Sequence, residues 1–418
     1  MPVLAGLRHI PSTLAQPNYG IYVAGNSLSL IGSWMQRVGV GWLAWDLSHS
    51  GAVLGLVAFA DLFPTLIIGP FGGALADRLD RRMLLAIGQT VNMLLSFLLF
   101  GLIVADLITV PLLVLIVAAN GAVIGVNQPA RLALISKLVP RDHLPTAVAI
   151  NSLVFNLARF IGPAIAGLVI LSFSIAAVFL VNGLSFISFL IALSRLDLPV
   201  EEDAGRRAEA LPMLQAIGEG LRYVAGHPGI GPLLALHATL SVTARAFVEL
   251  LPGLADAVFD HGAGGLAALS SAVGIGAIAA GLFLAQRGPR KDLAETAMLA
   301  ALLIALSTLA LALSPTFWLA LIAVTVGGFG MVTAGVGTQT LLQTSVDEAI
   351  RGRVLSLFGL IFRSGPAVGA LAMGVASEGV GLRWPLAIGG LLGVAAWATI
   401  WQRRRRISAA LQPIRDRG

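Results

Sequence analysis

Six charged residues lie inside long apolar segments of the sequence. They are Arg37, Asp61, Arg159, Arg245, Glu249 and Arg363. A charged side chain near the centre of a bilayer costs at least about 2.5–3.5 kcal/mol, so each of these residues needs a reason to be there. Four arginines against two carboxylates leave an excess of positive charge, which favours contact with an anionic or electron-rich molecule such as a catecholate or a carboxylate.

The two carboxylates are the candidates for a group that takes up and releases a proton and so couples proton movement to another process. Such a group must change its ionisation as its access to solvent changes. Asp61 is preferred, since Phe59 and Phe63 flank it and an apolar environment favours the protonated carboxyl. Glu249 is the second candidate. The alternative is that both are permanently paired: Arg37 with Asp61 on the neighbouring helix, and Arg245 with Glu249 four residues further along its own helix.

Arg37 and Arg245 are separated by 208 residues and occupy equivalent places in two halves of the chain. We expect both to contact substrate, unless they serve only the ion pairs above. Uncharged polar residues that could complete a binding site are Gln36, Asn26, Asn120 and Asn127. The alternative for each is a hydrogen bond between helices, worth on average about 0.6 kcal/mol.

The composition points to lipid as the solvent of this chain. Of 418 residues, 57% are hydrophobic and 11% are charged, with a mean hydropathy of +0.89. The chain contains no cysteine, and its six histidines show no metal-binding spacing, so we expect no metal and no cofactor. The sequence also lacks the nucleotide loop GxxxxGK[ST] and the nucleophile elbow GxSxG, so we do not expect an enzyme. The basic residues are spread over short connections, which argues against nucleic acid as a partner.

A transmembrane helix needs about 20 mostly apolar residues, and the sequence predicts twelve of them. The expected spans are 19–45, 52–76, 83–105, 110–136, 145–170, 174–195, 229–256, 264–286, 293–313, 316–343, 352–377 and 382–402. Lys and Arg concentrate in the connections on one side, and these segments are retained in the cytoplasm. Both termini are therefore expected on the cytoplasmic face of the membrane.

The predicted organisation is an N-terminal bundle of six helices over residues 1–196, a cytoplasmic linker over 197–228 and a C-terminal bundle with a basic tail over 229–418. The linker contains the amphipathic run PMLQAIGEGLRYV, which predicts a helix on the membrane surface. The two halves also show a weak repeat at offsets of 203 to 209 residues. Matches between spans of the same rank predict parallel halves, because six spans is an even number.

The residues between the second and third spans, Gly73 to Arg82, read GALADRLDRR. They resemble the signature loop of the major facilitator superfamily, and the likeness extends over the whole chain. This resemblance implies an all-α integral membrane fold of twelve helices in two parallel pseudo-symmetric bundles of six. It also implies a charge-operated gate formed by Gly73, Asp77, Arg78, Arg81 and Arg82. The alternative is that the basic residues only anchor the turn to lipid headgroups. In the second half, Gln286 stands where the first has an aspartate.

Other stretches most resemble the branch of the superfamily that contains the bacterial enterobactin exporter and drug and macrolide efflux proteins. They are Asn127-Gln-Pro-Ala-Arg131, Leu138-Val-Pro-Arg-Asp142, Arg159-Phe-Ile-Gly162-Pro163, Arg351-Gly-Arg353-Val-Leu-Ser and Arg363-Ser-Gly365-Pro366. Both Gly-Pro pairs follow an arginine and predict close helix packing, with a role in coupling as the alternative. Ala166 departs from the exporter motif, where a glycine is expected.

The resemblance implies a monomeric secondary transporter of a bacterial inner membrane that exports a siderophore-like or drug-like molecule in exchange for protons. Its partners would then be a small-molecule substrate, protons and membrane lipids. Two other hypotheses remain open at this point: uptake or transport of a lipid-like substrate, and a membrane receptor or scaffold that transports nothing.

Overall fold

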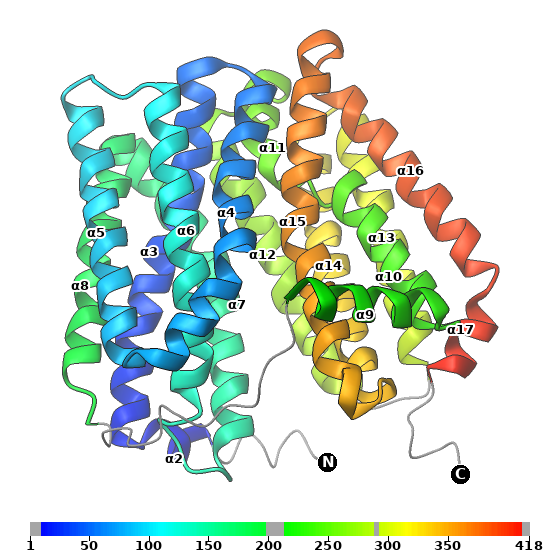
Figure 1. Cartoon of the computed structure of the whole chain (residues 1–418). Helices are drawn as coiled ribbons and strands as arrows, with labels where there is room; N and C mark the ends of the chain where they lie inside the picture. The colour runs from blue at the N-terminus through cyan, green and yellow to red at the C-terminus, as the bar shows by residue number, and fades with distance from the viewer. Residues whose placement is uncertain (1–9, 198–212, 288–291, 412–418) are drawn as a thin grey trace. The chain divides into compact units, whose positions relative to one another are not determined.

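The computed structural model describes residues 10–197, 213–287 and 292–411, and the regular structure within these ranges is helical (Figure 1). The first half contains α2 (Ile10–Leu14), α3 (Pro17–Ser48), α4 (Gly51–Arg78), α5 (Arg81–Val104), α6 (Val110–Ile135), α7 (Leu144–Ser172) and α8 (Ile175–Ser194). The rest of the chain contains α9 (Met213–Gly226), α10 (Ile230–Thr243), α11 (Phe247–Gly253), the π-helical turn η1 (Leu254–Val258), α12 (Gly262–Arg287), α13 (Leu293–Leu313), α14 (Phe317–Ser345), α15 (Glu348–Val380), α16 (Arg383–Trp401) and α17 (Arg404–Ala410).

The helix starts follow from local sequence. Pro17 lies in the first turn of α3, where its missing N–H costs nothing. The side chains of Asp80 and Ser174 accept hydrogen bonds from the free backbone N–H groups at the starts of α5 and α8.

Eleven segments of the described residues are long and apolar enough to cross a membrane. The first predicted span, α3, is not among them, although it has 32 residues. Its Asn, Ser, Gln and Gly residues and its three tryptophans lower its mean hydropathy, and many of these residues are buried against other helices instead of facing lipid. The all-helical membrane fold is thus confirmed, and the number of twelve spans is confirmed approximately.

The seventh predicted span, 229–256, is present as the crossing Ile230–Val258, but its helix is interrupted. α10 ends at Thr243, three residues follow in a turn, and α11 and η1 complete the crossing. At the interruption the N–H groups of both Ala244 and Arg245 donate to the carbonyl of Leu240. The hydroxyl of Thr308 on α13 donates to the carbonyl of Ala244 at 3.0 Å, so a neighbouring helix satisfies a group that the break exposes.

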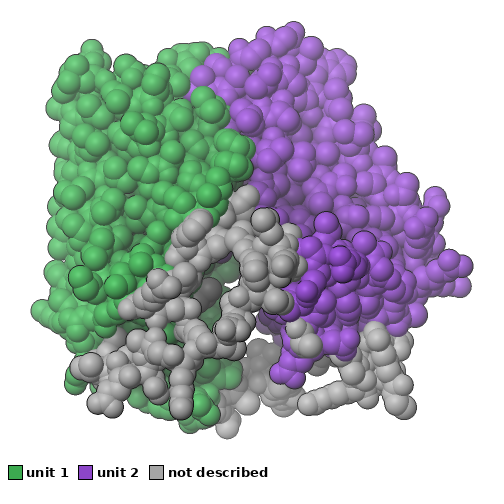
Figure 2. Space-filling view, viewed as in Figure 1, with its two compact units in different colours: residues 1–49, 56–206, 255–271 green, residues 50–55, 207–254, 272–418 purple. Residues whose placement is uncertain are grey.

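The chain divides into two compact units, coloured separately in Figure 2. Unit 1 comprises residues 1–49, 56–206 and 255–271, and unit 2 comprises residues 50–55, 207–254 and 272–418. These boundaries resemble the predicted division near residue 200 but differ from it at two short segments. Each unit includes the first turns of a helix whose remainder lies in the other unit.

Close backbone packing explains both exceptions. Within unit 2, a Cβ added to Gly55 of α4 would lie 2.4 Å from the carbonyl oxygen of Ala370 on α15. Within unit 1, a Cβ added to Gly167 of α7 would lie 2.3 Å from the Cβ of Ala267 on α12. Small residues allow helix axes to approach this closely, which is the usual way that helices associate in membranes.

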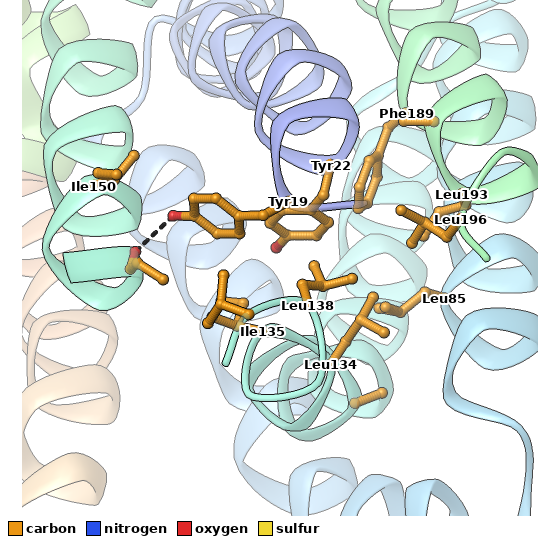
Figure 3. Close-up of a cluster of buried hydrophobic side chains, with 14 of the residues drawn as sticks. Tyr19, Tyr22, Leu85, Leu134, Ile135, Leu138, Ile150, Phe189, Leu193 and Leu196 are labelled. Carbon is orange, nitrogen blue, oxygen red and sulfur yellow. Dashed lines mark hydrogen bonds between the residues drawn. The ribbon is translucent and has the colours of Figure 1, made fainter. Parts of the chain in front are cut away.

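The core of unit 1 contains a cluster of aromatic and aliphatic side chains where α3, α5, α6, α7 and α8 meet (Figure 3). Tyr19 and Tyr22 are fully buried there, and the ring of Tyr22 packs edge-on against Phe189. The hydroxyl of Tyr19 donates to the carbonyl of Ala147 at 2.7 Å, drawn as a dashed line in Figure 3. This bond joins the start of the first span to the start of the fifth.

The predicted amphipathic segment forms α9, a 14-residue helix packed against α15 in unit 2. Glu219 of α9 makes an ion pair with Arg353 of α15. Leu221 on the same helix is exposed. Residues 198–212 of the predicted linker lie outside the described residues.

Candidate functional site

The ion pair expected between the first two spans is present in unit 1. Nη1 of Arg37 on α3 lies 2.7 Å from Oδ2 of Asp61 on α4. The side chains retain 34% and 23% of their accessible surface, so the pair is screened less than a surface pair and can still be reached. The alternative that Arg37 pairs with Asp61 is thereby confirmed, and the pair itself becomes the centre of the candidate site.

The ring of Trp34 lies beside this pair and connects it to Arg159. The guanidinium carbons of Arg37 and Arg159 lie 6.0 Å and 5.6 Å from the centroid of the Trp34 ring. Phe155 packs edge-on against the same ring at 5.6 Å. Tryptophan is the strongest aromatic partner of a cation, so one ring keeps two arginines in a small region of unit 1.

Gly162 determines how closely α7 approaches α3 at this point. A Cβ at Gly162 would lie 2.6 Å from the Cβ of Trp34 and 2.9 Å from the carbonyl oxygen of Ile31. Only glycine fits at that distance, and Pro163 next to it is buried within the helix. Arg159 precedes Gly162 by about one turn, so the close crossing brings its guanidinium to Trp34.

Unit 2 contains a related cluster at the break between α10 and α11. The guanidinium of Arg245 lies 3.9 Å from the centroid of the Phe362 ring, and its Nη1 lies 3.4 Å from the hydroxyl of Ser241. A Cβ at Gly365 would lie 2.3 Å from the Cβ of Ser241, so α15 crosses α10 as closely as α7 crosses α3.

The remaining predicted residues of this region surround the same crossing. Pro366 is buried within α15, whereas Arg363 on that helix is exposed. Glu249 is half-buried in the first turn of α11, four residues after Arg245.

The uncharged polar residues predicted to bind substrate lie mostly in the interior of unit 1. Gln36 is buried, and its amide oxygen accepts hydrogen bonds from Ser96 at 2.7 Å and Asn182 at 2.6 Å. Asn120 is half-buried and donates to Asn92 at 3.4 Å. These bonds join α3, α5, α6 and α8, as the alternative of interhelical hydrogen bonding requires.

Asn26 and Asn127 are also buried, and they differ from Gln36 in their hydrogen bonding. The amide oxygen of Asn26 and both amide atoms of Asn127 have no hydrogen-bond partner among the described residues. Asn127 lies against Gly88 of α5, where an added Cβ would come within 1.9 Å of its nitrogen. Orphaned amides of this kind are satisfied by bound water or by a ligand.

The predicted gate lies at the turn between α4 and α5. Gly73, Asp77 and Arg78 belong to the last turns of α4, and their side chains lie outside the described part of the structure. Arg82 is described and donates to the carbonyl oxygens of Ser194 at 2.7 Å and Leu196 at 2.9 Å. It therefore ties the turn to the end of α8, where a cation also complements the helix dipole.

Charges from two turns approach each other beside this loop. Burial lowers the pKa of Lys137, and the positive charge of Arg81 lowers it further, while Asp80 acts in the opposite direction. A Lys ammonium next to α6 was not among the predicted gate residues. Its position at the end of the fourth span, in a turn with other basic residues, was the available signal.

Three hydrogen bonds to two carboxylates, Asp256 and Glu378, were not anticipated. Nε1 of Trp45 on α3 donates to Oδ2 of Asp256 at 2.8 Å, within unit 1. Oε1 of Glu378 on α15 accepts from the hydroxyl of Ser50 at 2.7 Å and from the backbone N–H of Ala52 at 3.1 Å, within unit 2. No local pattern in the sequence identifies such distant partners.

Comparison with known proteins identifies the family. The major facilitator family model described as a transmembrane secretion effector matches residues 12–414. The chain is 24% identical over 398 residues to the staphyloferrin A transporter of Staphylococcus aureus (strain NCTC 8325 / PS 47), covering 94% of this chain and 97% of that protein. It is 28% identical over 341 residues to the enterobactin exporter EntS of Shigella flexneri, covering 79% and 76% of the two chains.

Solved structures show the same fold at low sequence identity. A POT family transporter superposes with a TM-score of 0.73 at 12% identity, covering 93% of this chain and 96% of that one. The nucleoside transporter NupG superposes with a TM-score of 0.67 at 15% identity, covering 92% and 98%. The chain is thus a multi-pass membrane protein, and it belongs to the transmembrane secretion effector family of major facilitator transporters.

Proposed function

We propose that this transporter exports a small, siderophore-like organic molecule across the bacterial inner membrane in exchange for protons. Alternating access of one site to the two sides would drive the exchange. The observation that carries this proposal is the partly exposed pair Arg37–Asp61 beside Trp34 and Arg159. It combines a proton acceptor, cations for an anionic group and an aromatic surface in one part of unit 1.

The class of substrate is supported by the arginines and by the names of two relatives. The named substrates of these relatives are staphyloferrin A and enterobactin, and one of the two proteins is described as an exporter. Within unit 1, Arg37 and Arg159 supply fixed positive charge for carboxylate or catecholate groups, and Trp34 supplies a flat apolar surface for the body of such a molecule. Unit 2 contains its own pairing of the same kind, Arg245 on the ring of Phe362.

The direction of proton movement depends on what the substrate offers to Asp61. If a substrate hydroxyl donates to Asp61 while an anionic group contacts Arg37, binding requires the ionised carboxylate. Protonation of Asp61 then competes with substrate, and linkage between the two gives exchange. If the anionic group instead displaced Asp61 from Arg37, the isolated carboxylate would take up a proton, and both would move together. We propose the first arrangement.

Access to the site would be controlled by the loop between α4 and α5. In the proposed cycle, Asp77, Arg78 and Arg81 form contacts in one conformation and release them in the other, while Arg82 keeps the turn attached to α8. The role of this group as a gate comes from its resemblance to the superfamily signature loop.

Proteoliposomes test the proposal through the sign of a pH change. Staphyloferrin A or enterobactin is added outside vesicles that contain a pH-sensitive dye, with the membrane potential clamped at zero. Exchange makes the lumen more alkaline as substrate enters, whereas acidification of the lumen would contradict the proposal.

Asp61→Asn should allow substrate exchange without proton movement. Asp46→Asn, which changes an exposed aspartate near the end of α3, is the matched control and should behave as wild type. Proton movement that persists unchanged in Asp61→Asn would remove this residue from the mechanism.

A further inference from the structure

Unit 2 contains a cavity between α12, α13 and α14 that lies outside the candidate transport site. Its volume is about 210 Å³, and its lining includes Asp292, Glu295, Leu299, Leu303, Phe329 and Thr333. A single water needs roughly 10–15 Å³ on the same measure, so the cavity has room for a ligand group. Its lining is negatively charged at one end and apolar at the other.

The charged end consists of two carboxylates where α13 begins. Asp292 is exposed, and Glu295 is half-buried in the first turn of α13. The hydroxyl of Thr296 donates to the backbone carbonyl of Asp292 at 2.9 Å, so it is already engaged within its own helix. Two negative charges at the mouth of an otherwise apolar cavity favour a cationic group there.

The middle of the cavity contains a polar atom that the protein leaves unsatisfied. Thr333 on α14 is 1% exposed, and its Oγ1 has no hydrogen-bond partner among the described residues. A buried hydroxyl without a partner destabilises the fold, and a ligand with a suitable acceptor would offset that cost.

The depth of Thr333 follows from the packing of α14 on α13. A Cβ added to Gly330 would lie 2.9 Å from the carbonyl oxygen of Ala300, and a Cβ added to Gly337 would lie 3.3 Å from the Cβ of Ala297. Thr333 lies between these glycines and therefore at the level of Leu299, about four residues beyond Glu295. At a rise of 1.5 Å per residue, this is about 6 Å deeper than the carboxylate residue.

Beyond Thr333 the cavity is apolar and open to the side of the helix bundle. The rings of Phe283 and Phe329 contact each other at a centroid distance of 5.5 Å. Leu299 on α13 is 47% exposed, and Leu282 on α12 and Leu306 on α13 are also exposed. Such side chains face hydrocarbon in a membrane protein, so a ligand chain can leave the cavity directly into the bilayer.

We propose that this cavity binds an amphiphile whose primary ammonium group lies at Asp292 and Glu295, with phosphatidylethanolamine as the natural ligand. The ammonium donates up to three hydrogen bonds to the carboxylates. An ester carbonyl several ångströms further along the molecule accepts from Thr333, and the acyl chains follow Leu299 and Leu303 into the bilayer. A quaternary choline headgroup has no N–H and cannot make the first contacts. This site goes beyond the proposed transport function and does not depend on it.

The test uses the full-length protein in nanodiscs that contain phosphatidylglycerol in equal share with either phosphatidylethanolamine or phosphatidylcholine. Native mass spectrometry counts the retained lipids, and thermal unfolding gives the Tm in each mixture. The wild type should retain phosphatidylethanolamine in preference and should have a higher Tm in its presence. Glu295→Gln should weaken this retention about tenfold, as expected for loss of one charge-assisted hydrogen bond. Glu348→Gln is the matched control, because it changes an exposed acid in the first turn of α15 that does not line the cavity.

Thr333 gives a second signature that a merely structural role would not produce. Thr333→Val removes the orphaned hydroxyl, so its Tm should rise in phosphatidylcholine while the additional increase with phosphatidylethanolamine is lost. Thr333→Ser should restore the wild-type response.

Decylammonium and decyltrimethylammonium separate the possible sources of the ligand. Competition by decylammonium alone supports recognition of the ammonium, and binding of decylammonium without any lipid preference identifies a cationic amphiphile as the occupant. Equal retention of both lipids with no binding of decylammonium, or equal effects of Glu295→Gln and Glu348→Gln, would overturn the proposal.

Discussion

The guanidinium of Arg245 lies 3.9 Å from the centre of the Phe362 ring, closer than either arginine of unit 1 lies to Trp34. This contact joins the interrupted seventh span to α15. A partly desolvated cation on an aromatic face is worth about 1–2 kcal/mol. Phe362→Leu should therefore lower the Tm, while Phe362→Tyr, which keeps the ring, should restore it. Equal Tm values for the Leu and Tyr variants would mean that the aromatic contact contributes nothing.

Gly162→Ala should disturb the candidate site through packing alone. The added methyl would meet the Cβ of Trp34 and the backbone of Ile31, and backbone cannot move aside as a flexible side chain can. Overpacking of this kind typically costs 1–3 kcal/mol, so we expect a lower Tm and slower transport. The control is Gly101→Ala in α5, where an added Cβ meets nothing within 4 Å. That variant should be neutral or slightly stabilising, because alanine is the better helix former.

Thr308→Val should destabilise the broken seventh span. Its hydroxyl is the group that donates to the carbonyl of Ala244, and the buried carbonyl would be left without that bond. The expected cost is about 1–3 kcal/mol, measured as a loss of stability in denaturant or heat. Thr325→Val serves as the control, since the hydroxyl of Thr325 donates only to Leu321 of its own helix. Similar losses in the two variants would contradict a special role for Thr308.

Glu378→Ala should loosen the start of α4. The carboxylate accepts from Ser50 and from the N–H of Ala52, which is one of the amides that a helix start leaves without an internal partner. Hydrogen exchange of the first turn of α4 should accelerate, with Glu378→Gln closer to wild type because its amide oxygen can still accept. Glu348→Ala should leave exchange at this turn unchanged. Protection that persists in Glu378→Ala would show that the cap is dispensable.

Much of this architecture could be predicted because the length of a hydrophobic stretch and the spacing of a repeat can be read directly from a sequence. The ion pair of Arg37 with Asp61 was among the predicted alternatives, since two opposite charges on neighbouring spans rarely stay apart in lipid. The arginines followed by Gly162 and Gly365 also stood out in the sequence, because each precedes a Gly-Pro pair. The structure shows that α7 crosses α3 closely at Gly162 and that α15 crosses α10 closely at Gly365.

The interruption of the seventh span could not be predicted. The residues at the break, Thr243 to Ala246, include neither glycine nor proline, which are the usual local causes. The break is stabilised by other helices: Gly369 and Gly389 approach the carbonyls of Val242 and Thr243, and Thr308 bonds to the next carbonyl. The orientation of a side chain also depends on the neighbouring helices. The positions of Gln36 and Asn127 along their spans therefore predicted how deep they lie in the membrane, but not toward which helix they point.

The continuity of α3 and the interruption of its counterpart in the second half have a mechanical consequence. α3 runs without a break for 32 residues and resists bending as a single rod. The corresponding crossing consists of short pieces joined by a turn and a π-helical segment, so its axis can change direction by exchanging a few backbone hydrogen bonds. The two crossings occupy equivalent places in the two bundles and yet differ in stiffness. The first can transmit a displacement along its whole length, whereas the second can bend in its middle.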